Sequence, residues 1–334
     1  MSSISKSERS YIQSSLHSTP AIRADGRGLA DFRHVFLETG IAPLANGSAR
    51  VNVGKAAHEG GGGTEVIAAV KLEVENVQAG EGTEGGRIVC NVSCSPTAYP
   101  NLSSNALDEL QYDYSTILHQ TLSHPTLHPR NLGILRGKKA WLLSLDVSIL
   151  SDAGNAYDVI FMAARAAVWD TKVPKTRSVQ YAGRGRARAP EGNMDVDDNS
   201  AGPSNLDTRN VPTATDFELT DTWDEGEPLQ GRDRWPICIT LNIDPPIHYL
   251  DATLTEEAAT PLRLLLMFSF LPSSPAVLQG MKLLGPGEVN LEHVKYFISE
   301  GEKYARALFN ALDSKLLEED VRRNQKARSK FSAR

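Results

Sequence analysis

The sequence contains little cysteine and no long apolar run. Its three cysteines, Cys90, Cys94 and Cys238, are too few for a disulfide framework, and we expect buried free thiols, not metal ligands. No apolar stretch reaches the roughly 18 residues that a membrane-spanning helix needs, so we expect no membrane partner. Residues 1–9 are polar and lack the apolar core of a signal peptide. Together these absences predict an intracellular protein.

Positive charge is also scarce. The formal net charge is −6 and the isoelectric point is about 5.8. A free-standing nucleic-acid binder is usually basic, because neutralising phosphates drives such binding. If the chain contacts RNA, we therefore expect a local patch or a surface shared within an assembly. With 334 residues and 40% hydrophobic content, the chain can bury a sizeable core, as one two-lobed domain or as two domains.

Hydrophobic periodicity predicts groups of strands interrupted by helices. Apolar residues at helical spacing predict helices over 5–16, 104–122, 156–170 and from Asn290 onward. Alternating or clustered apolar residues predict strands over 33–39, 49–53, 65–74, 87–94, 139–150, 235–242, 247–251, 262–270 and 277–283. Strands, then helices, then further strands and a closing helix predict an α+β fold, a sandwich of mixed sheets and helices.

Composition divides the chain further. We expect an N-terminal helix in 1–20, a single two-lobed domain over 21–320 and a basic tail over 321–334. Residues 183–205 contain almost no large apolar side chains and cannot offset the entropy of ordering, so we predict a disordered insertion there. Its Gly-Arg repeats could bind RNA. Acidic residues follow them directly in the sequence, which favours a solvated loop.

A charged motif made of Arg23, Asp25, Gly26 and Arg27 opens the domain. Its charges could face RNA. We favour a salt-bridged turn, in which Gly26 supplies a backbone conformation that other residues resist. The motif predicts a structural role for these four residues.

The charged motif is the first of several segments that share a pattern. They are Arg-x-Asp-Gly-Arg at 23–27, Gly-Ser-x-x-x-x-x-Gly at 47–54, the strand 142–147 followed by Gly-Asn at 154–155, Asp-Thr-Lys-Val-Pro at 170–174 and Asp-x-Thr-x-x-Glu-Glu at 251–257. In this order the segments resemble the RNase PH family of phosphate-using 3′→5′ RNA exonucleases and their inactive relatives. The last resembles the exosome branch of that family. Residues 262–283 lack the glycines and charges that usually separate two strands there, so the register of those strands stays open.

The resemblance implies a fold and an assembly. The fold is the RNase PH-like sandwich of the ribosomal protein S5 domain 2 type. The assembly is a six-membered ring of such subunits, through which RNA threads, with RNA-binding cap subunits and a separate nuclease subunit. For this chain the resemblance implies ring neighbours and RNA as partners, and a location in nucleus, nucleolus and cytoplasm.

The resemblance also identifies where catalysis would occur. Phosphorolysis needs a clamp for inorganic phosphate and a carboxylate near the scissile bond. Active family members carry that carboxylate in an Asp-Gly-Gly turn, and the aligned residues here are Ala153, Gly154 and Asn155. Asp152 is one residue away, and its side chain is expected on the other face. The family's arginine-rich phosphate segment aligns with 101–109, which contains no arginine and two acids. We therefore expect a non-catalytic subunit, with an active phosphate-dependent exoribonuclease as the alternative.

Three arginines are candidates for RNA contact. Arg50 could line an RNA path or pair with a neighbouring subunit, and the sequence leaves both open. Arg322 and Arg323 begin the basic tail, where a solvated helix end is the simpler interpretation. A free RNA-binding protein that uses 183–188 and this tail is a second alternative. We expect no metal and no cofactor, because prolines break the helix that would align the histidines of 119–128.

Overall fold

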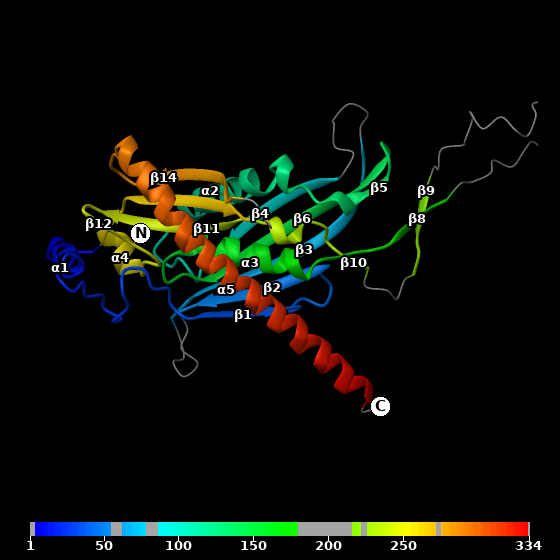
Figure 1. Cartoon of the computed structure of the whole chain (residues 1–334), viewed down its shortest axis with the longest axis horizontal. Coiled ribbons are helices and arrows are strands. Elements are labelled where there is room, and N and C mark those ends of the chain that lie inside the picture. Colours follow the sequence, from blue (N-terminus) through cyan, green and yellow to red (C-terminus); the bar gives the residue numbers. More distant parts are fainter. Residues whose placement is uncertain are drawn as a thin grey trace, which may run out of the picture.

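The computed structural model of the chain describes residues 4–54, 62–77, 86–179, 216–221, 226–271 and 275–332. These residues form stacked layers of β-sheet and helix, so the predicted α+β fold is confirmed (Figure 1). The predicted disordered insertion at 183–205 lies outside the described residues.

The first sheet comes from the N-terminal half of the chain. Its strand order is β1 (Val35–Thr39), β2 (Gly47–Val53), β3 (Thr64–Asn76), β6 (Lys139–Ser151) and β4 (Arg87–Cys94), with β5 (Gly133–Leu135) paired to β6. Neighbouring strands are antiparallel, except that β4 and β6 run parallel. Buried and exposed residues alternate along β4, which places Cys90 and Cys94 on the buried face as free thiols, as predicted.

The second sheet comes from the C-terminal half. Its order is β12 (Ile247–Tyr249), β11 (Ile237–Asp244), β13 (Arg263–Ser269) and β14 (Val277–Leu284), all antiparallel. The structure supplies the register that the sequence left open. Arg263 lies opposite Leu284 and Ser269 opposite Val277, with one shift between Met267 and Phe268.

Helix α3 (Ala156–Asp170) is the centre of the molecule. Every one of its residues is buried, because β2 and β3 pack on one side and β11 on the other. Small alanines along the helix let both sheets approach closely. At Gly47 the approach is so close that a Cβ would lie 2.5 Å from the Ala167 carbonyl.

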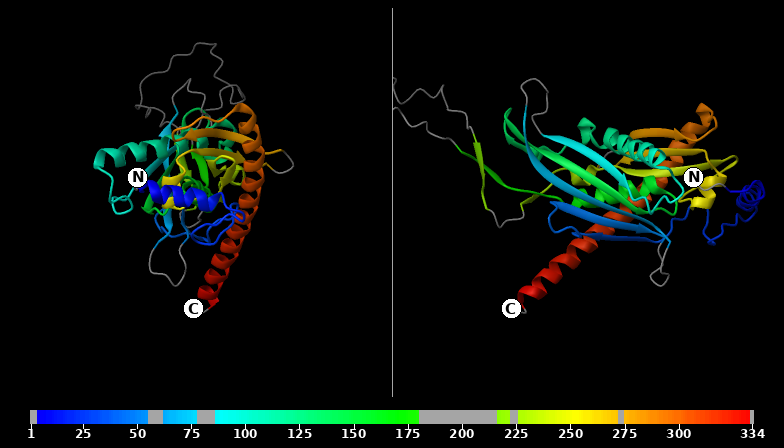
Figure 2. Two further views of the ribbon diagram at one scale, coloured as in Figure 1. Left: turned by 90° about the vertical axis from the view of Figure 1, so that its left-hand side faces the viewer. Right: turned by 180° about the vertical axis from the view of Figure 1, so that it is seen from behind.

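Further helices complete the layers. Helix α2 (Ser104–Leu122) packs on β4, and α5 (Leu291–Ser332) crosses the outer side of β11 and β13. The C-terminal part of α5 projects from the body (Figure 2). Helix α1 (Lys6–Leu16) packs on α4 (Leu254–Ala259), where the Arg9 and Gln13 side chains donate to the carbonyls of Ala258 and Ala259 at 3.3 Å. Within the described residues, no helix has the length and apolarity needed to cross a bilayer.

The periodicity did not predict several short elements. They are α4, the ribbon of β7 (Lys172–Val173) with β10 (Glu227–Pro228), the ribbon of β8 (Thr176–Val179) with β9 (Asp216–Leu219), and single turns at Pro125–Leu127, Arg130–Leu132 and Arg232–Arg234. Elements of two to six residues contain too few positions for a period to emerge. Each depends on packing against a longer element.

The basic segment expected from residue 321 onward lies within a helix. Helix α5 runs without a break to Ser332, so the basic segment continues a helix. The Arg322 guanidinium contacts Glu319 one turn earlier at 2.7 Å, a spacing that supports helix.

Candidate functional site

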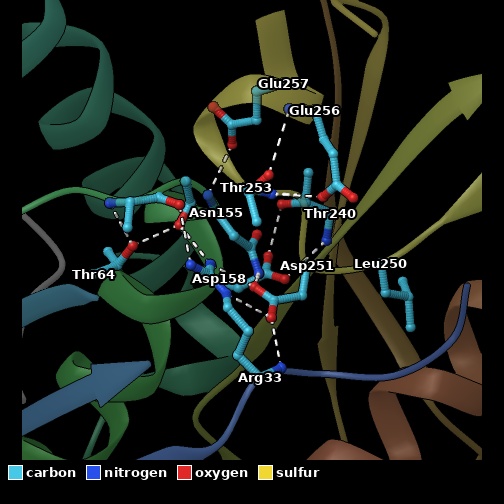
Figure 3. Close-up of polar contacts among 12 residues, drawn as sticks. Arg33, Thr64, Asn155, Asp158, Thr240, Leu250, Asp251, Thr253, Glu256 and Glu257 are labelled. Carbon is cyan, nitrogen blue, oxygen red and sulfur yellow. Dashed lines mark hydrogen bonds and ion pairs between the residues drawn. The ribbon is translucent and has the colours of Figure 1, made fainter. Parts of the chain in front are cut away.

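The turn that connects β6 to α3 holds the position where the family resemblance predicts a catalytic aspartate. Ala153 occupies it and offers no carboxylate. The Ala153 backbone N–H donates to the Thr64 hydroxyl at 3.0 Å, and its carbonyl accepts from Arg33 at 3.0 Å. The Thr64 hydroxyl donates in turn to the Gly154 carbonyl at 2.6 Å (Figure 3). The backbone of this turn is therefore fixed by its neighbours.

Asp152 is the nearest acid to that position. Its carboxylate accepts from the Gly154 N–H at 2.8 Å, so it closes the turn in which it lies. Burial, together with the nearby Asp152 charge, raises the pKa of Tyr114 well above its ordinary value. Burial likewise raises the pKa of Tyr99, with contributions from Tyr114 and Asp152. Asp152 thus faces aromatic hydroxyls on the α2 side.

Close packing determines the shape of the turn. Gly154 has φ +98°, and a Cβ there would lie 2.4 Å from the Ala252 carbonyl. Asn155 follows with φ 60°, and its amide donates to Asp251 at 3.0 Å. The Asn155 backbone N–H donates to Glu257 at 2.8 Å. Helix α3 therefore begins at a turn that is held by the α4 segment.

Asp251 is the centre of the surrounding polar network. Its side chain is fully buried and accepts from the Arg33 guanidinium at 2.7 and 2.9 Å, and from Arg27 at 2.9 Å. Burial alone would raise the pKa of Asp251, but hydrogen bonds from Arg33 hold it below its ordinary value. The carboxylate stays ionised because two guanidinium groups compensate it.

The charged motif at the start of the domain supplies the other half of this network. Arg23 is buried and donates to both oxygens of Glu256, at 2.9 and 2.7 Å, and to the carbonyls of Leu250 and Asp251. Arg27 contacts Asp25 at 2.6 Å, besides its contact with Asp251. The structure thus places these motif residues in a salt-bridged turn, with Gly26 at φ +76°.

Sequence reasoning missed the most connected members of the network. Arg33, Asn155, Asp251 and Glu257 were not candidate site residues, although three of them lie within the quoted motifs. Glu257 is partly buried, which raises its pKa, and its carboxylate lies 3.2 Å from the Arg263 guanidinium. The repeated acids of the Asp-x-Thr-x-x-Glu-Glu segment were the available signal, since a cluster of acids requires cations nearby.

Arg50 lies away from this network, on the first sheet. It is opposite Glu38 of β1 and Ile67 of β3, and its guanidinium contacts Glu65 at 2.5 Å. The side chain remains 39% exposed, so it is accessible to RNA or to a neighbouring subunit, and both assignments stay open.

Arg322 and Arg323 lie at the opposite end of α3 from the turn, about 20 Å away by the rise of that helix. Arg322 is exposed and pairs with Glu319, while Arg323 pairs with Asp170 at the C-terminal end of α3. The turn and these two arginines are therefore separate sites. The Gly-Arg segment at 183–188 lies outside the described residues. Within the described part of the chain, no three His, Cys, Asp or Glu side chains could together hold a metal ion.

Comparison with known proteins agrees with this geometry. Residues 31–174 match the RNase PH domain described as "3′ exoribonuclease family, domain 1". A Dictyostelium discoideum protein named as the exosome complex exonuclease RRP42 is 26% identical over 79% of this chain and 84% of its own length. Exosome complex component Rrp42 of Methanothermobacter thermautotrophicus is 31% identical over 46% of this chain and 53% of its own length. The chain thus spans about half of that archaeal relative.

Solved structures give the same fold. A chain of the Archaeoglobus fulgidus exosome with RNA bound to the active site matches 91% of this chain and 97% of its own length, with a TM-score of 0.63 and 20% identity. A chain of an archaeal exosome core gives a TM-score of 0.61 at the same identity. The chain therefore contains the matched exoribonuclease domain over residues 31–174, is similar to the exosome components named Rrp42, and has the same fold as these exosome chains.

Proposed function

We propose that this chain is a non-catalytic structural subunit of the RNA exosome ring. In this role it forms part of the wall of the RNA-threading channel and supports 3′→5′ RNA processing and degradation. The relatives named as exosome components, and the fold shared with exosome chains, support the assignment to a ring. Ring closure would cover strand edges and apolar surface that a monomer exposes.

The β6–α3 turn carries the non-catalytic part of the proposal. Ala153 stands where active relatives are expected to have an aspartate, and the Asp152 carboxylate is held by the Gly154 N–H. The start of α2 supports the same conclusion, because 101–109 offers acids and no arginine to an approaching phosphate. These two features support the non-catalytic part of the proposal.

The alternative is an active phosphate-dependent 3′→5′ exoribonuclease. Two observations favour testing it: the Dictyostelium relative is named as an exonuclease, and Asp152 is only half-buried one residue from the aligned position. An activity of this kind would need the turn to shift by one residue.

The proposal extends to partners and location. The neighbours are other RNase PH-like subunits in a six-membered ring, with RNA-binding cap subunits and a separate nuclease subunit. The RNAs are those of ribosomal RNA maturation and messenger RNA turnover. The proposed locations of the protein are the nucleus, the nucleolus and the cytoplasm.

Two measurements test the proposal. Purified chain is incubated with labelled RNA and inorganic phosphate, and we expect no nucleoside diphosphate above a mock preparation. Release above that level overturns the non-catalytic assignment. Native mass spectrometry of the affinity-purified chain should show several RNase PH-like partners at equal stoichiometry. A well-folded lone monomer at physiological concentration would contradict the ring.

A further inference from the structure

A small polar pocket lies near the C-terminal end of α3, far from the β6–α3 turn. Its volume is about 260 Å³, and its walls are the 40–46 loop together with Asp170, Lys172 and Arg323. None of the contacts of the turn network involves these three residues. The pocket is therefore a separate site.

Arg323 is fixed in the wall of this pocket. Its guanidinium contacts the Asp170 carboxylate, which also accepts from the Ser48 backbone N–H at 3.0 Å. The guanidinium lies directly over Gly40, where a Cβ would come within 2.7 Å of the Arg323 Cζ atom. Because Asp170 already compensates Arg323, these two groups contribute no net charge to the pocket.

Lys172 supplies an uncompensated positive charge. Its backbone N–H donates to the Asn46 carbonyl at 2.9 Å, which fixes the position of the residue. Its ammonium forms no hydrogen bond or ion pair within the ranges of the chain that the structure describes. The lining residues therefore have a net charge of about +1, and the half-buried Lys172 offers a charged donor for an anion.

The loop that lines the pocket also carries an exposed apolar side chain. Leu44 lies in the loop that forms the pocket wall, and it is 100% exposed. A pocket that contains an ammonium and has a fully exposed leucine in its wall loop matches a protein segment in which an acid neighbours an apolar residue. It matches RNA poorly, because RNA binding needs a run of cations along successive phosphates. Here Arg323 and the neighbouring Arg322 are each already paired with an acid, Asp170 and Glu319 respectively.

We propose that this pocket binds an acidic side chain of a partner protein, with Lys172 and Arg323 contacting its carboxylate and Leu44 packing on an adjacent apolar residue. This role depends neither on RNA passage nor on the loss of catalysis.

Site-specific photo-crosslinking tests the proposal. Leu44 is replaced by p-benzoylphenylalanine in the full-length chain, which is expressed in its own cells, irradiated and purified. We expect cross-links to a protein segment in which an Asp or Glu lies close to an apolar residue. Cross-links to RNA, to acid-free segments or to no molecule would overturn the proposal.

Charge exchange then tests the pairing. Lys172→Glu should weaken binding of the purified cross-linked partner on the order of tenfold or more, since attraction becomes repulsion. Changing the identified acid of the partner to Lys should restore binding to that variant. Lys175→Glu is the matched control, because it changes the net charge equally at a residue outside the pocket. This variant should bind the partner as the parent chain does. Lys172→Ala, which keeps the backbone contact, guards against a folding defect. Unchanged binding by a folded Lys172→Glu or Lys172→Ala variant rejects the site.

Discussion

Arg33 and Asp251 lie 218 residues apart in the chain, and their side chains form a bidentate ion pair at 2.7 and 2.9 Å. The same guanidinium donates to the carbonyls of Ala153 and Gly154 at 3.0 Å. One side chain therefore joins the entry to β1, the β6–α3 turn and the segment before α4. This contact holds in shape the turn where the family resemblance predicts a catalytic aspartate.

Replacing Arg33 by alanine should destabilise the protein by about 3 kcal/mol, because it removes a main partner of a fully buried carboxylate. Arg27 remains and compensates Asp251 in part. Urea unfolding of the variant and the parent chain measures the difference. Arg87→Ala is the control, because its pair with Glu75 is exposed and contributes about 1 kcal/mol or less. Equal losses in both variants would contradict a special role for Arg33.

Gly154→Ala should lower the free energy of unfolding more than Gly137→Ala does. Both glycines have positive φ, which costs alanine about 1 kcal/mol at either position. A Cβ at Gly154 would also lie 2.4 Å from the Ala252 carbonyl, whereas nothing lies within 4 Å at Gly137. The clash should add about 1–3 kcal/mol. Equilibrium unfolding measures the loss of stability in each variant. Equal losses would show that the turn and the α4 segment separate easily.

Ala153→Asp should leave phosphorolysis at the background level. The substitution restores a carboxylate at the aligned position, but the start of α2 still lacks arginine for phosphate. The assay is nucleoside diphosphate release from labelled RNA, with Asp152→Asn as a matched control. Clear release by Ala153→Asp, absent from the control, would show that phosphate is bound elsewhere in the chain.

Asp158 should make stability fall as the pH rises from about 4 to about 7. Burial raises its pKa to about 7, and hydrogen bonds from Thr240 only partly oppose this. Over that range the folded chain binds a proton that the unfolded chain has released, so the free energy of unfolding decreases. The full effect is on the order of 4 kcal/mol, because the pKa of Asp158 rises from its ordinary value to about 7 in the folded chain.

Asp158→Asn removes this titrating group. The difference in unfolding free energy between variant and parent should therefore grow in favour of the variant between about pH 4 and pH 7, and level off above. Urea titrations across this range measure it. A pH-independent difference would mean that Asp158 is ionised at a normal pKa in the folded chain.

Local sequence patterns determined the long elements of this protein. Helices α2 and α3 begin and end where periodicity predicts, because apolar residues recur at helical spacing along each of them. The strands of both sheets follow likewise, although the strand expected over 247–251 ends at Tyr249 and the one over 33–39 begins at Val35. Arg33 and Asp251 therefore lie outside the strands that were expected to contain them. Their side chains pair with each other in the polar network instead.

The sequence by itself determined the layers, the family resemblance and the absence of an acid at Ala153, since each is written in local composition and spacing. Only the tertiary structure decided that the arginines near the start of the domain meet the acids near residue 251, and that Lys172 and Arg323 share a pocket. These contacts join residues that are 150 or more apart in the chain. No local pattern predicts such pairs, because a buried charge takes its partner from whatever segment the packed layers bring beside it.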